Sequence, residues 1–233
     1  MDGIEGRVAF VTGGGRGIGR CIAETLRDLG AHVASGDLLS PEIGDVLGVQ
    51  VDVTSADSVD EGFSRIESEL GPVEILVINA GIFVVEPFAQ TTLETWQKIL
   101  DVNLTGAFVC AQRALPHMQA TGFGRIVTIG SSAGKTPGRN PSAAYGASKA
   151  GMMMMAKSIA SEYAKCGVTS NVIAPSYIAT EMISGLSDMS GVIPVGRMGT
   201  PEEVASLTAY LCSTQAAFIT GEVVDINGGN FID

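Results

Sequence analysis

Short apolar runs alternate along the chain with longer segments in which apolar residues recur every three or four positions. A continuous apolar run is typical of a buried strand, and the three-or-four spacing is typical of a helix that buries one face. The runs predict strands at residues 7–12, 31–36, 49–53, 73–78, 125–130, 168–174 and 222–226. The periodic segments predict helices at residues 20–29, 55–69, 93–100, 102–120, 143–166 and 200–213.

Capping residues and prolines indicate where several helices begin and end. Gly30 follows the first helix as a C-cap, and Thr200 with Pro201 begins the last one. Pro116 lies inside the predicted helix 102–120, where its missing N–H group should bend or shorten that helix. Residues 40–48 are polar and too few to form a full helix between the second and third strands.

Length and composition are those of a globular protein. The 233 residues are 45% hydrophobic, which suits a single domain over residues 1–233 with a large core. No uncharged apolar stretch is long enough to span a bilayer, and residues 1–7 lead into a strand without the apolar region of a signal peptide. The net charge of −11 disfavours nucleic acid or an anionic membrane as a partner.

Cysteine and histidine usage bears on metals and on the compartment. The four cysteines (Cys21, Cys110, Cys166 and Cys212) are scattered singly, and the chain has two histidines. This distribution argues against a disulfide framework and against a metal site, and it favours the reducing cytoplasm. Buried structural thiols are the expected role of the cysteines.

A glycine-rich turn, Gly13-Gly-Gly-Arg-Gly-Ile-Gly19, joins the first strand to the first helix. Glycine lets the backbone approach a pyrophosphate, and the helix N-terminus supplies free N–H groups and the positive end of its dipole. A glycine run alone is weak evidence. Between a strand and a capped amphipathic helix, it indicates dinucleotide binding.

The second strand leads directly into Asp37, where a carboxylate can accept both hydroxyls of an adenosine ribose. This carboxylate would also repel a 2′-phosphate, since one charge pair at about 4 Å is worth about 4 kcal/mol at an effective dielectric constant of about 20. Arg16 opposes this preference, because its guanidinium could reach a 2′-phosphate. The position of Asp37 favours NAD(H) over NADP(H), and a solvated loop acid is its alternative role.

Two further strand ends carry candidate cofactor contacts. Asp52 follows the third strand and could bind an adenine amino group, or it could cap the helix near residues 55–69, although Thr54 and Ser55 are nearer. The segment Asn79-Ala80-Gly81 follows the fourth strand, and its small residues allow close packing against a nucleotide.

The main candidate for catalysis lies in residues 128–151, which contain Ser132, Tyr145 and Lys149. Tyr145 and Lys149 are four residues apart, so on a helix both side chains leave one face. A free tyrosine has a pKa of about 10, and a lysine cation within roughly 4–6 Å lowers that pKa. Tyr145 could then transfer a proton near neutral pH, and Ser132 could hydrogen-bond a substrate oxygen. Such Tyr–Lys pairs are also common on solvated helices, and Ser-Ser-Ala-Gly is ordinary loop sequence.

Taken together, these motifs resemble the short-chain dehydrogenase/reductase family. The match rests on Thr12-Gly-Gly-Gly-Arg-Gly-Ile-Gly19, Asp52-Val53, Asn79-Ala-Gly81, Asn103, Ser132, Tyr145-x-x-x-Lys149, Asn171-x-x-x-Pro175 and Ile219-Thr-Gly-x4-Ile226-Asn-Gly-Gly. Any one motif is modest, but their order and spacing over nearly the whole chain are specific. The resemblance implies an α/β fold, a Rossmann-type doubly wound sheet of about seven parallel strands with helices on both faces. It also implies a bound nicotinamide cofactor and a homotetramer or dimer.

The resemblance implies roles for individual residues as well. Tyr145 is the acid–base, and Lys149 lowers its pKa and bonds the nicotinamide ribose. Ser132 polarises the carbonyl, and Asn103 holds a water for proton relay. The implied cofactor-binding residues are Gly13, Gly15, Arg16, Gly17, Ile18, Gly19, Asp37, Asp52, Val53, Asn79, Ala80, Gly81, Tyr145, Lys149, Pro175, Ile178 and Thr180.

The last third of the chain is the expected substrate side. The family usually has glycine where this chain has Ser176, and serine would cost about 1 kcal/mol there if the position needs a positive φ. Residues 181–195 are implied to form a short, mobile substrate lid. Residues 152–155 are four consecutive methionines that cannot all face one core, so some should pack against another subunit, as should the tail 230–233.

Three functions are considered. The leading one is hydride transfer between NAD(H) and a ketone or secondary alcohol, with a 3-oxoacyl thioester as substrate, because residues 193–204 and the C-terminal tail resemble 3-oxoacyl-thioester reductases most. Against this substrate stand Asp37 and the net charge, since those reductases generally prefer NADPH and dock an acidic carrier protein. The second is an NAD-dependent dehydrogenase of a small alcohol, polyol, sugar or steroid. The third is a cofactor-sensing protein without turnover, which the complete catalytic set disfavours.

Overall fold

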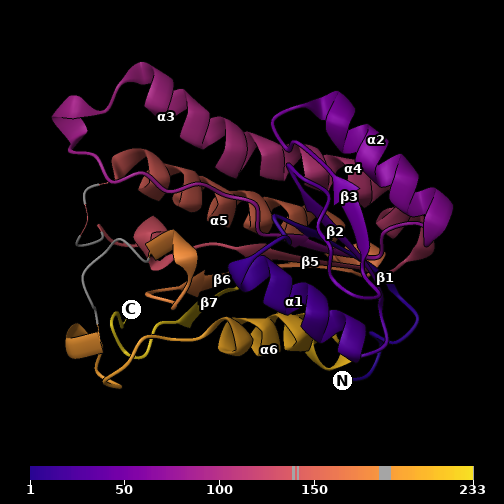
Figure 1. The fold of residues 1–233 in the computed structure, drawn as a ribbon. Coiled ribbons are helices and arrows are strands. Elements are labelled where there is room, and N and C mark those ends of the chain that lie inside the picture. The colour runs from indigo at the N-terminus through magenta and orange to yellow at the C-terminus, as the bar shows by residue number, and fades with distance from the viewer. Residues whose placement is uncertain (138–139, 141, 184–189, 233) are drawn as a thin grey trace.

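A parallel sheet of seven strands forms the middle layer of the protein, in the order β3-β2-β1-β4-β5-β6-β7 (Figure 1). The computed structural model describes residues 1–137, 140, 142–183 and 190–232. The strands are β1 (Val8–Thr12), β2 (His32–Asp37), β3 (Leu47–Gln50), β4 (Ile75–Ile78), β5 (Gly124–Ile129), β6 (Val168–Pro175) and β7 (Val223–Ile226). The chain runs outward from β1 to β3 and then crosses to the other side of β1 with β4. The predicted doubly wound sheet is therefore confirmed.

Helices cover both faces of the sheet. On one face lie α1 (Gly17–Asp28) and α6 (Pro201–Cys212) (Figure 1). On the other lie α2 (Ala56–Glu69), α4 (Gly106–Thr121) and α5 (Ala143–Tyr163). The short α3 (Leu93–Leu100) precedes α4 and packs against α5. No helix separates β2 from β3, as predicted from the short polar segment at residues 40–48.

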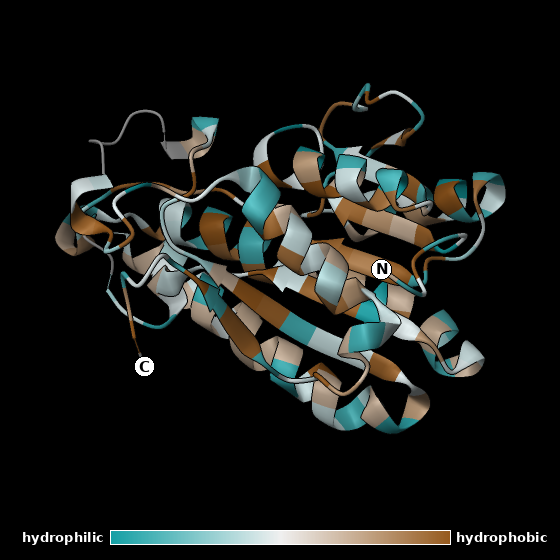
Figure 2. Ribbon diagram, turned by 90° about the horizontal axis from the view of Figure 1, so that it is seen from below, coloured by the Kyte–Doolittle hydropathy of each residue, from teal (hydrophilic) through white to brown (hydrophobic). Residues whose placement is uncertain are grey.

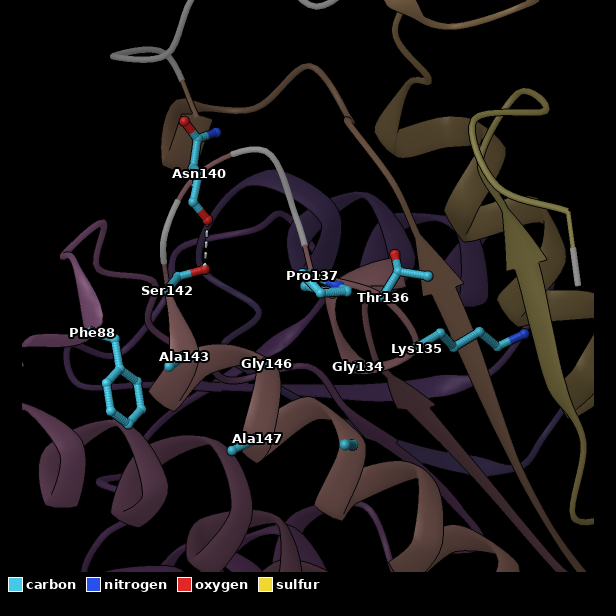
Figure 3. Close-up of a pocket in the computed structure, with 12 residues that line it drawn as sticks. Phe88, Gly134, Lys135, Thr136, Pro137, Asn140, Ser142, Ala143, Gly146 and Ala147 are labelled. Atoms are coloured by element: carbon cyan, nitrogen blue, oxygen red, sulfur yellow. Dashed lines mark hydrogen bonds between the residues drawn. The ribbon is translucent and has the colours of Figure 1, made fainter.

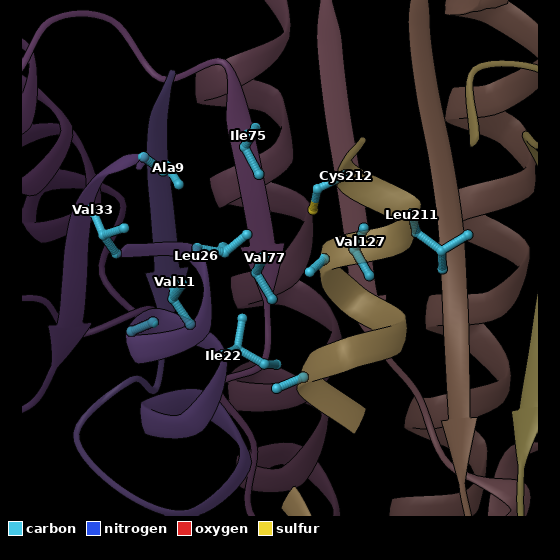
Figure 4. Close-up of a cluster of buried hydrophobic side chains, with 14 of the residues drawn as sticks. Ala9, Val11, Ile22, Leu26, Val33, Ile75, Val77, Val127, Leu211 and Cys212 are labelled. Atoms are coloured by element: carbon cyan, nitrogen blue, oxygen red, sulfur yellow. The ribbon is translucent and has the colours of Figure 1, made fainter. Parts of the chain in front are cut away.

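Two apolar clusters hold these layers together. The strands β1, β4, β5 and β6 are buried at every position, as expected where both faces of a sheet are covered, and the sheet is correspondingly apolar in Figure 2. Between the sheet and the α1–α6 layer, Ile22, Leu26 and Leu211 belong to one cluster of buried side chains (Figure 4). On the opposite face, the rings of Phe10 and Phe63 meet edge to face with their centroids 5.2 Å apart.

The third strand differs from its predicted position. It spans Leu47–Gln50 rather than residues 49–53, because it pairs in register with β2, whose last residue, Asp37, lies opposite Gln50. Asp52 therefore lies in a turn beyond the strand and not at its end.

The segment between α3 and α4 also differs from the prediction. The sequence predicts separate helices at residues 93–100 and 102–120, whereas a π-helical turn, Asp101–Thr105, joins them without a break, and the fully buried Asn103 lies in that turn. Pro116 does not shorten α4, which continues to Thr121 and ends at Gly122 with a φ of +72°. Its neighbours Leu115 and Met118 are buried in the core, and this packing offsets the cost of a proline inside a helix.

The remaining local predictions agree with the structure or are refined by it. Thr200 caps α6 through a reciprocal capping box with Glu203, and Pro201 occupies the first turn as predicted. The helix predicted at 143–166 is α5 followed by a 3-10 turn, Ala164–Cys166. Among the described residues only glycines have a positive φ, so Ser176 carries no such strain. Its Oγ accepts a hydrogen bond from Asn230 Nδ2 at 3.0 Å.

Candidate active site

The glycine-rich turn between β1 and α1 needs glycine for both conformation and packing. Gly13 and Gly17 have φ angles of +63° and +54°. A Cβ atom on Gly13 would lie 2.7 Å from the Ala80 Cα, and one on Gly19 would lie 2.3 Å from the Gly13 carbonyl oxygen. The backbone of the turn is thus packed directly against the end of β4.

Thr12 and Asn79 hold this turn in place. Asn79 Nδ2 donates to the carbonyl oxygens of Thr12 and Gly13 at 3.0 and 2.8 Å. Thr12 Oγ1 accepts from the N–H groups of Asn79 and Ala80 at 3.0 and 3.1 Å. The amide of Asn79, a predicted cofactor contact, therefore positions the turn, and Thr12 is a supporting residue to which the sequence analysis gave no role.

No side chain in the described part of the chain caps the N-terminus of α1. Arg16 occupies the N-cap position without a side-chain hydrogen bond to the helix. Its guanidinium instead lies 3.7 Å from Glu181, and both side chains are about 80% exposed. Uncapped N–H groups at the start of a 12-residue helix suit a pyrophosphate, so the cradle fits a dinucleotide.

Asp37 faces this turn from the end of β2. Its Oδ2 accepts from the Gly15 N–H group at 3.1 Å, and its Oδ1 accepts from the Leu38 N–H group at 2.8 Å. Each carboxylate oxygen has a second lone pair, so the half-buried group can still accept ribose hydroxyls. The contact also explains Gly15, because a Cβ there would lie 2.8 Å from Asp37 Oδ2.

Asp52 and Val53 shape the turn after β3. Asp52 Oδ1 accepts from the N–H and hydroxyl groups of Thr54 at 2.9 and 2.7 Å. It does not cap α2, because Ser55 is the N-cap and accepts from the Ser58 N–H group. Val53 packs against α4, where a Cβ on Gly106 would lie 2.8 Å from its Cγ2.

The loop after β6 reaches back to the glycine-rich turn. Pro175 ends the strand, and the buried Ile178 pairs with Gly199 in an isolated bridge. A Cβ placed on Gly17 would lie 3.7 Å from Thr180 Cγ2, so Thr180 is brought to the turn. Of the predicted lid at 181–195, residues 184–189 lie outside the described residues.

Tyr145 lies in the first turn of α5, and the Ser131 side chain is close enough to its hydroxyl to lower its pKa. Ser131 has extended backbone angles, and neighbouring side chains in extended backbone point to opposite sides. Ser132, the predicted partner, is in the 3-10 turn Ser132–Gly134, and its carbonyl oxygen accepts from the Lys135 and Thr136 N–H groups at 3.0 Å. The structure thus brings Ser131, and not Ser132, to Tyr145. Because the two serines are adjacent and identical, the sequence gives no signal for choosing between them.

Lys149 lies close to the Tyr145 ring, and Asn103 is linked to the Tyr145 backbone. Lys149 is 4% exposed, donates to the Ile129 carbonyl oxygen at 2.8 Å, and places its Nζ 5.6 Å from the centre of the Tyr145 ring. Asn103 Nδ2 donates to Ser148 Oγ at 3.0 Å, and that hydroxyl donates to the Tyr145 carbonyl oxygen at 2.7 Å. The buried amide is therefore linked to α5 through one hydroxyl.

Burial shifts the pKa values of Tyr145 and Lys149 in opposite directions. It raises the pKa of Tyr145 above its ordinary value, and the nearby Ser131 side chain offsets only part of that rise. Burial also lowers the pKa of Lys149 to about 8. Burial of Tyr145 therefore opposes the predicted lowering of its pKa by Lys149.

A pocket of about 490 Å³ lies beside this site (Figure 3). It is formed by the turn after β5, the first turns of α5 and Phe88. Neither Tyr145 nor Lys149 lines it, so it adjoins this pair of residues and does not enclose them. Over the described ranges, no group of His, Cys, Asp or Glu is arranged to hold a metal ion. No helix in the same ranges is long and apolar enough to cross a membrane.

The fold and site define a class of protein, the nicotinamide-dependent oxidoreductases with a Tyr–Lys pair on one helix. Comparisons agree: a family model described as enoyl-(acyl carrier protein) reductase matches residues 13–230. The 3-oxoacyl-(acyl-carrier-protein) reductase MabA of Mycobacterium tuberculosis is 44% identical, covering 96% of this chain and 92% of its own length. The reductase FabG of Escherichia coli is 40% identical, covering 98% and 99%.

Solved structures show the same relationship. The 3-ketoacyl-(acyl-carrier-protein) reductase from Brucella melitensis complexed with NADH has a TM-score of 0.94 and 29% identity, over 98% of this chain and 100% of that one. The aldohexose dehydrogenase of Thermoplasma acidophilum has a TM-score of 0.91 and 32% identity, over 97% and 94%. The chain belongs to the short-chain dehydrogenase/reductase family and is an NAD(P)-dependent oxidoreductase acting on CH–OH or C=O groups.

Proposed function

We propose that the protein reduces 3-oxoacyl thioesters with NADH. The observation that carries the ketoreductase chemistry is the Tyr145 hydroxyl, with the Ser131 side chain beside it and the buried Lys149 close by. The substrate class is supported by MabA and FabG, which are 44% and 40% identical and are named as 3-oxoacyl-(acyl-carrier-protein) reductases.

In the reducing direction, the hydroxyls of Ser131 and Tyr145 hold the substrate carbonyl oxygen. Negative charge builds on that oxygen during reduction, so donors already in place stabilise the transition state. A bound nicotinamide dinucleotide supplies the hydride. Tyr145 then gives its proton to the alkoxide, a role that its raised pKa suits, because the hydroxyl stays protonated at neutral pH. Lys149, with a pKa of about 8, is largely cationic at pH 7 and stabilises the tyrosinate left behind.

Other residues of the site would hold the dinucleotide. The turn Gly13-Gly-Gly-Arg-Gly-Ile-Gly19 and the start of α1 would bind the pyrophosphate. Asp37 would accept the adenosine ribose hydroxyls. The Ile178 backbone and Thr180 would contact the carboxamide, and Lys149 would contact the nicotinamide ribose, as the family resemblance implies.

The preference for NADH rests on two carboxylates. Asp37 would place its charge where NADPH carries a 2′-phosphate. Arg16, the residue that could have offset this charge, faces Glu181 at 3.7 Å. The alternative substrate class, a small alcohol, polyol or sugar, is supported by the likeness to the aldohexose dehydrogenase.

We further propose that residues 1–233 act as one domain within a cytoplasmic homotetramer or dimer. Phe108 on α4 and Met154 on α5 are 50% and 63% exposed, although Met152 and Met153 of the methionine run are buried. Exposed apolar side chains of this size suit a subunit interface.

Steady-state reduction of an acetoacetyl thioester, measured with NADH and with NADPH in parallel, tests the proposal. We expect turnover with both and a higher kcat/KM with NADH. Tyr145→Phe should abolish turnover while the affinity for NADH changes by less than about threefold, because the ring keeps its packing. Retained turnover in Tyr145→Phe would refute the catalytic assignment, and turnover of polyols alone would favour the alternative substrate.

A further inference from the structure

The loop after the cofactor-binding segment runs directly past the catalytic tyrosine. It begins at Gly81, where a Cβ would lie 3.6 Å from Lys149 Nζ. It ends at Glu86, which forms an isolated parallel bridge with Ser142, immediately before α5. Residues 82–85 therefore connect the lysine side of the site to the end of α5 that carries Tyr145.

Asn103 fixes the path of this loop. Its Oδ1 accepts from the Ile82 N–H group at 2.8 Å, and its Nδ2 donates to the Ile82 carbonyl oxygen at 3.1 Å. Two hydrogen bonds from one fully buried amide leave little freedom at Ile82. Because these hydrogen bonds fix the backbone at Ile82, they also fix the point from which the next residue, Phe83, extends.

Phe83 lies edge to face against Tyr145, with ring centroids 4.9 Å apart and an angle of 69° between the rings. It is half-buried, so part of the ring remains accessible beside the catalytic side chain. Val84 and Val85 follow it and are 39% and 45% exposed. An apolar surface therefore continues from the catalytic tyrosine to the outside along residues 83–85.

A substrate whose carbonyl oxygen meets the Tyr145 hydroxyl must place one of its two substituents near this surface. An alkyl substituent would gain free energy by leaving water there, whereas a hydroxylated substituent would lose hydrogen bonds to water without replacement. We propose that Phe83 is a specificity-determining residue that contacts the alkyl chain of the substrate next to the reacting carbon and favours acyl chains over polyols. The inference rests on the proposed acyl substrate for its biological meaning, but its test does not depend on a thioester.

The test measures kcat/KM with NADH for two series of increasing chain length, straight-chain 2-alkanones and 3-oxoacyl thioesters of N-acetylcysteamine. It compares the wild type with Phe83→Ala, Phe83→Leu and the control Phe218→Ala. Phe218 is fully exposed just before β7, it does not line the pocket, and no ring contact joins it to Tyr145 in the part of the chain described. The pH profile of kcat/KM is recorded for each variant to detect a disturbed Tyr145.

We expect the wild type to gain up to about fourfold in kcat/KM for each of the first added methylenes, the value for a fully buried CH₂ group. Phe83→Ala should lose most of that gain while its pH profile is unchanged, Phe83→Leu should keep most of it, and Phe218→Ala should match the wild type. A uniform loss on all substrates in Phe83→Ala would mean that the ring only supports Tyr145, and it would overturn the proposal. A wild type without any gain along either series would also overturn it. Turnover and chain-length gain with ketones but not thioesters would refute the proposed substrate and leave the role of Phe83 intact.

Discussion

Replacing Asp37 by asparagine should reverse much of the cofactor preference. The change removes one negative charge near the expected 2′-phosphate, where a charge pair at about 4 Å is worth about 4 kcal/mol at an effective dielectric constant of about 20. Asp37 is half-buried at the edge of the site, so solvent and salt screen part of this energy. We expect kcat/KM with NADPH to rise about 10- to 100-fold.

The same change should weaken the use of NADH. The carboxylate uses one oxygen for the Gly15 N–H group and the other for the Leu38 N–H group, and asparagine offers a single acceptor oxygen. The loss of about one hydrogen bond predicts an approximately tenfold higher KM for NADH. Steady-state kinetics with both cofactors at fixed ionic strength measure the two effects.

The control for this experiment is Asp45→Asn, which makes the same change of charge in the exposed loop between β2 and β3. It should leave the ratio of the two kcat/KM values within about twofold of the wild type, because an exposed charge away from the phosphate is screened. If Asp37→Asn also leaves that ratio unchanged, Asp37 does not read the ribose and the assignment of NADH is wrong.

Three further predictions test the site. Ser131→Ala should lower kcat about 100-fold by removing a donor to the carbonyl oxygen, whereas Ser132→Ala should have little effect; the reverse order would restore Ser132 as the catalytic hydroxyl. Reduction should slow as the pH rises through about 8, because Lys149 loses its proton there, and Lys149→Arg should move this fall to higher pH; an unchanged profile would assign the fall to another group. Gly19→Ala should weaken NADH binding at least tenfold, because its Cβ would lie 2.3 Å from the Gly13 carbonyl oxygen, and unaltered binding by fluorescence titration would contradict this.

Much of the fold could be predicted because its signals are local. Apolar runs and helical periodicity are properties of neighbouring residues, so they place the strands and helices to within a few positions. Capping obeys local rules as well, and Thr200 with Pro201 begins α6 as predicted. The bounds of β3 differ from the predicted ones because they depend on pairing with β2, a segment more than ten residues earlier in the chain.

The catalytic pair could also be predicted, but its chemistry depends on burial. The spacing of Tyr145 and Lys149 places both on one helical face whatever surrounds them. The direction of their pKa shifts depends on how completely the surrounding layers remove water, which no local pattern encodes. The raised pKa of Tyr145 is therefore a property of the packed molecule.

The order of elements, the glycine-rich turn and the residue types available for catalysis follow from local patterns along the chain. The packing of distant segments brings Ser131 to Tyr145, lets Asn79 hold the glycine-rich turn, and places Phe83 against Tyr145. Each of these contacts joins segments that are distant in the chain. Their geometry follows from the packing of whole layers, whereas the pattern along the chain reflects each segment's own preference for strand, turn or helix.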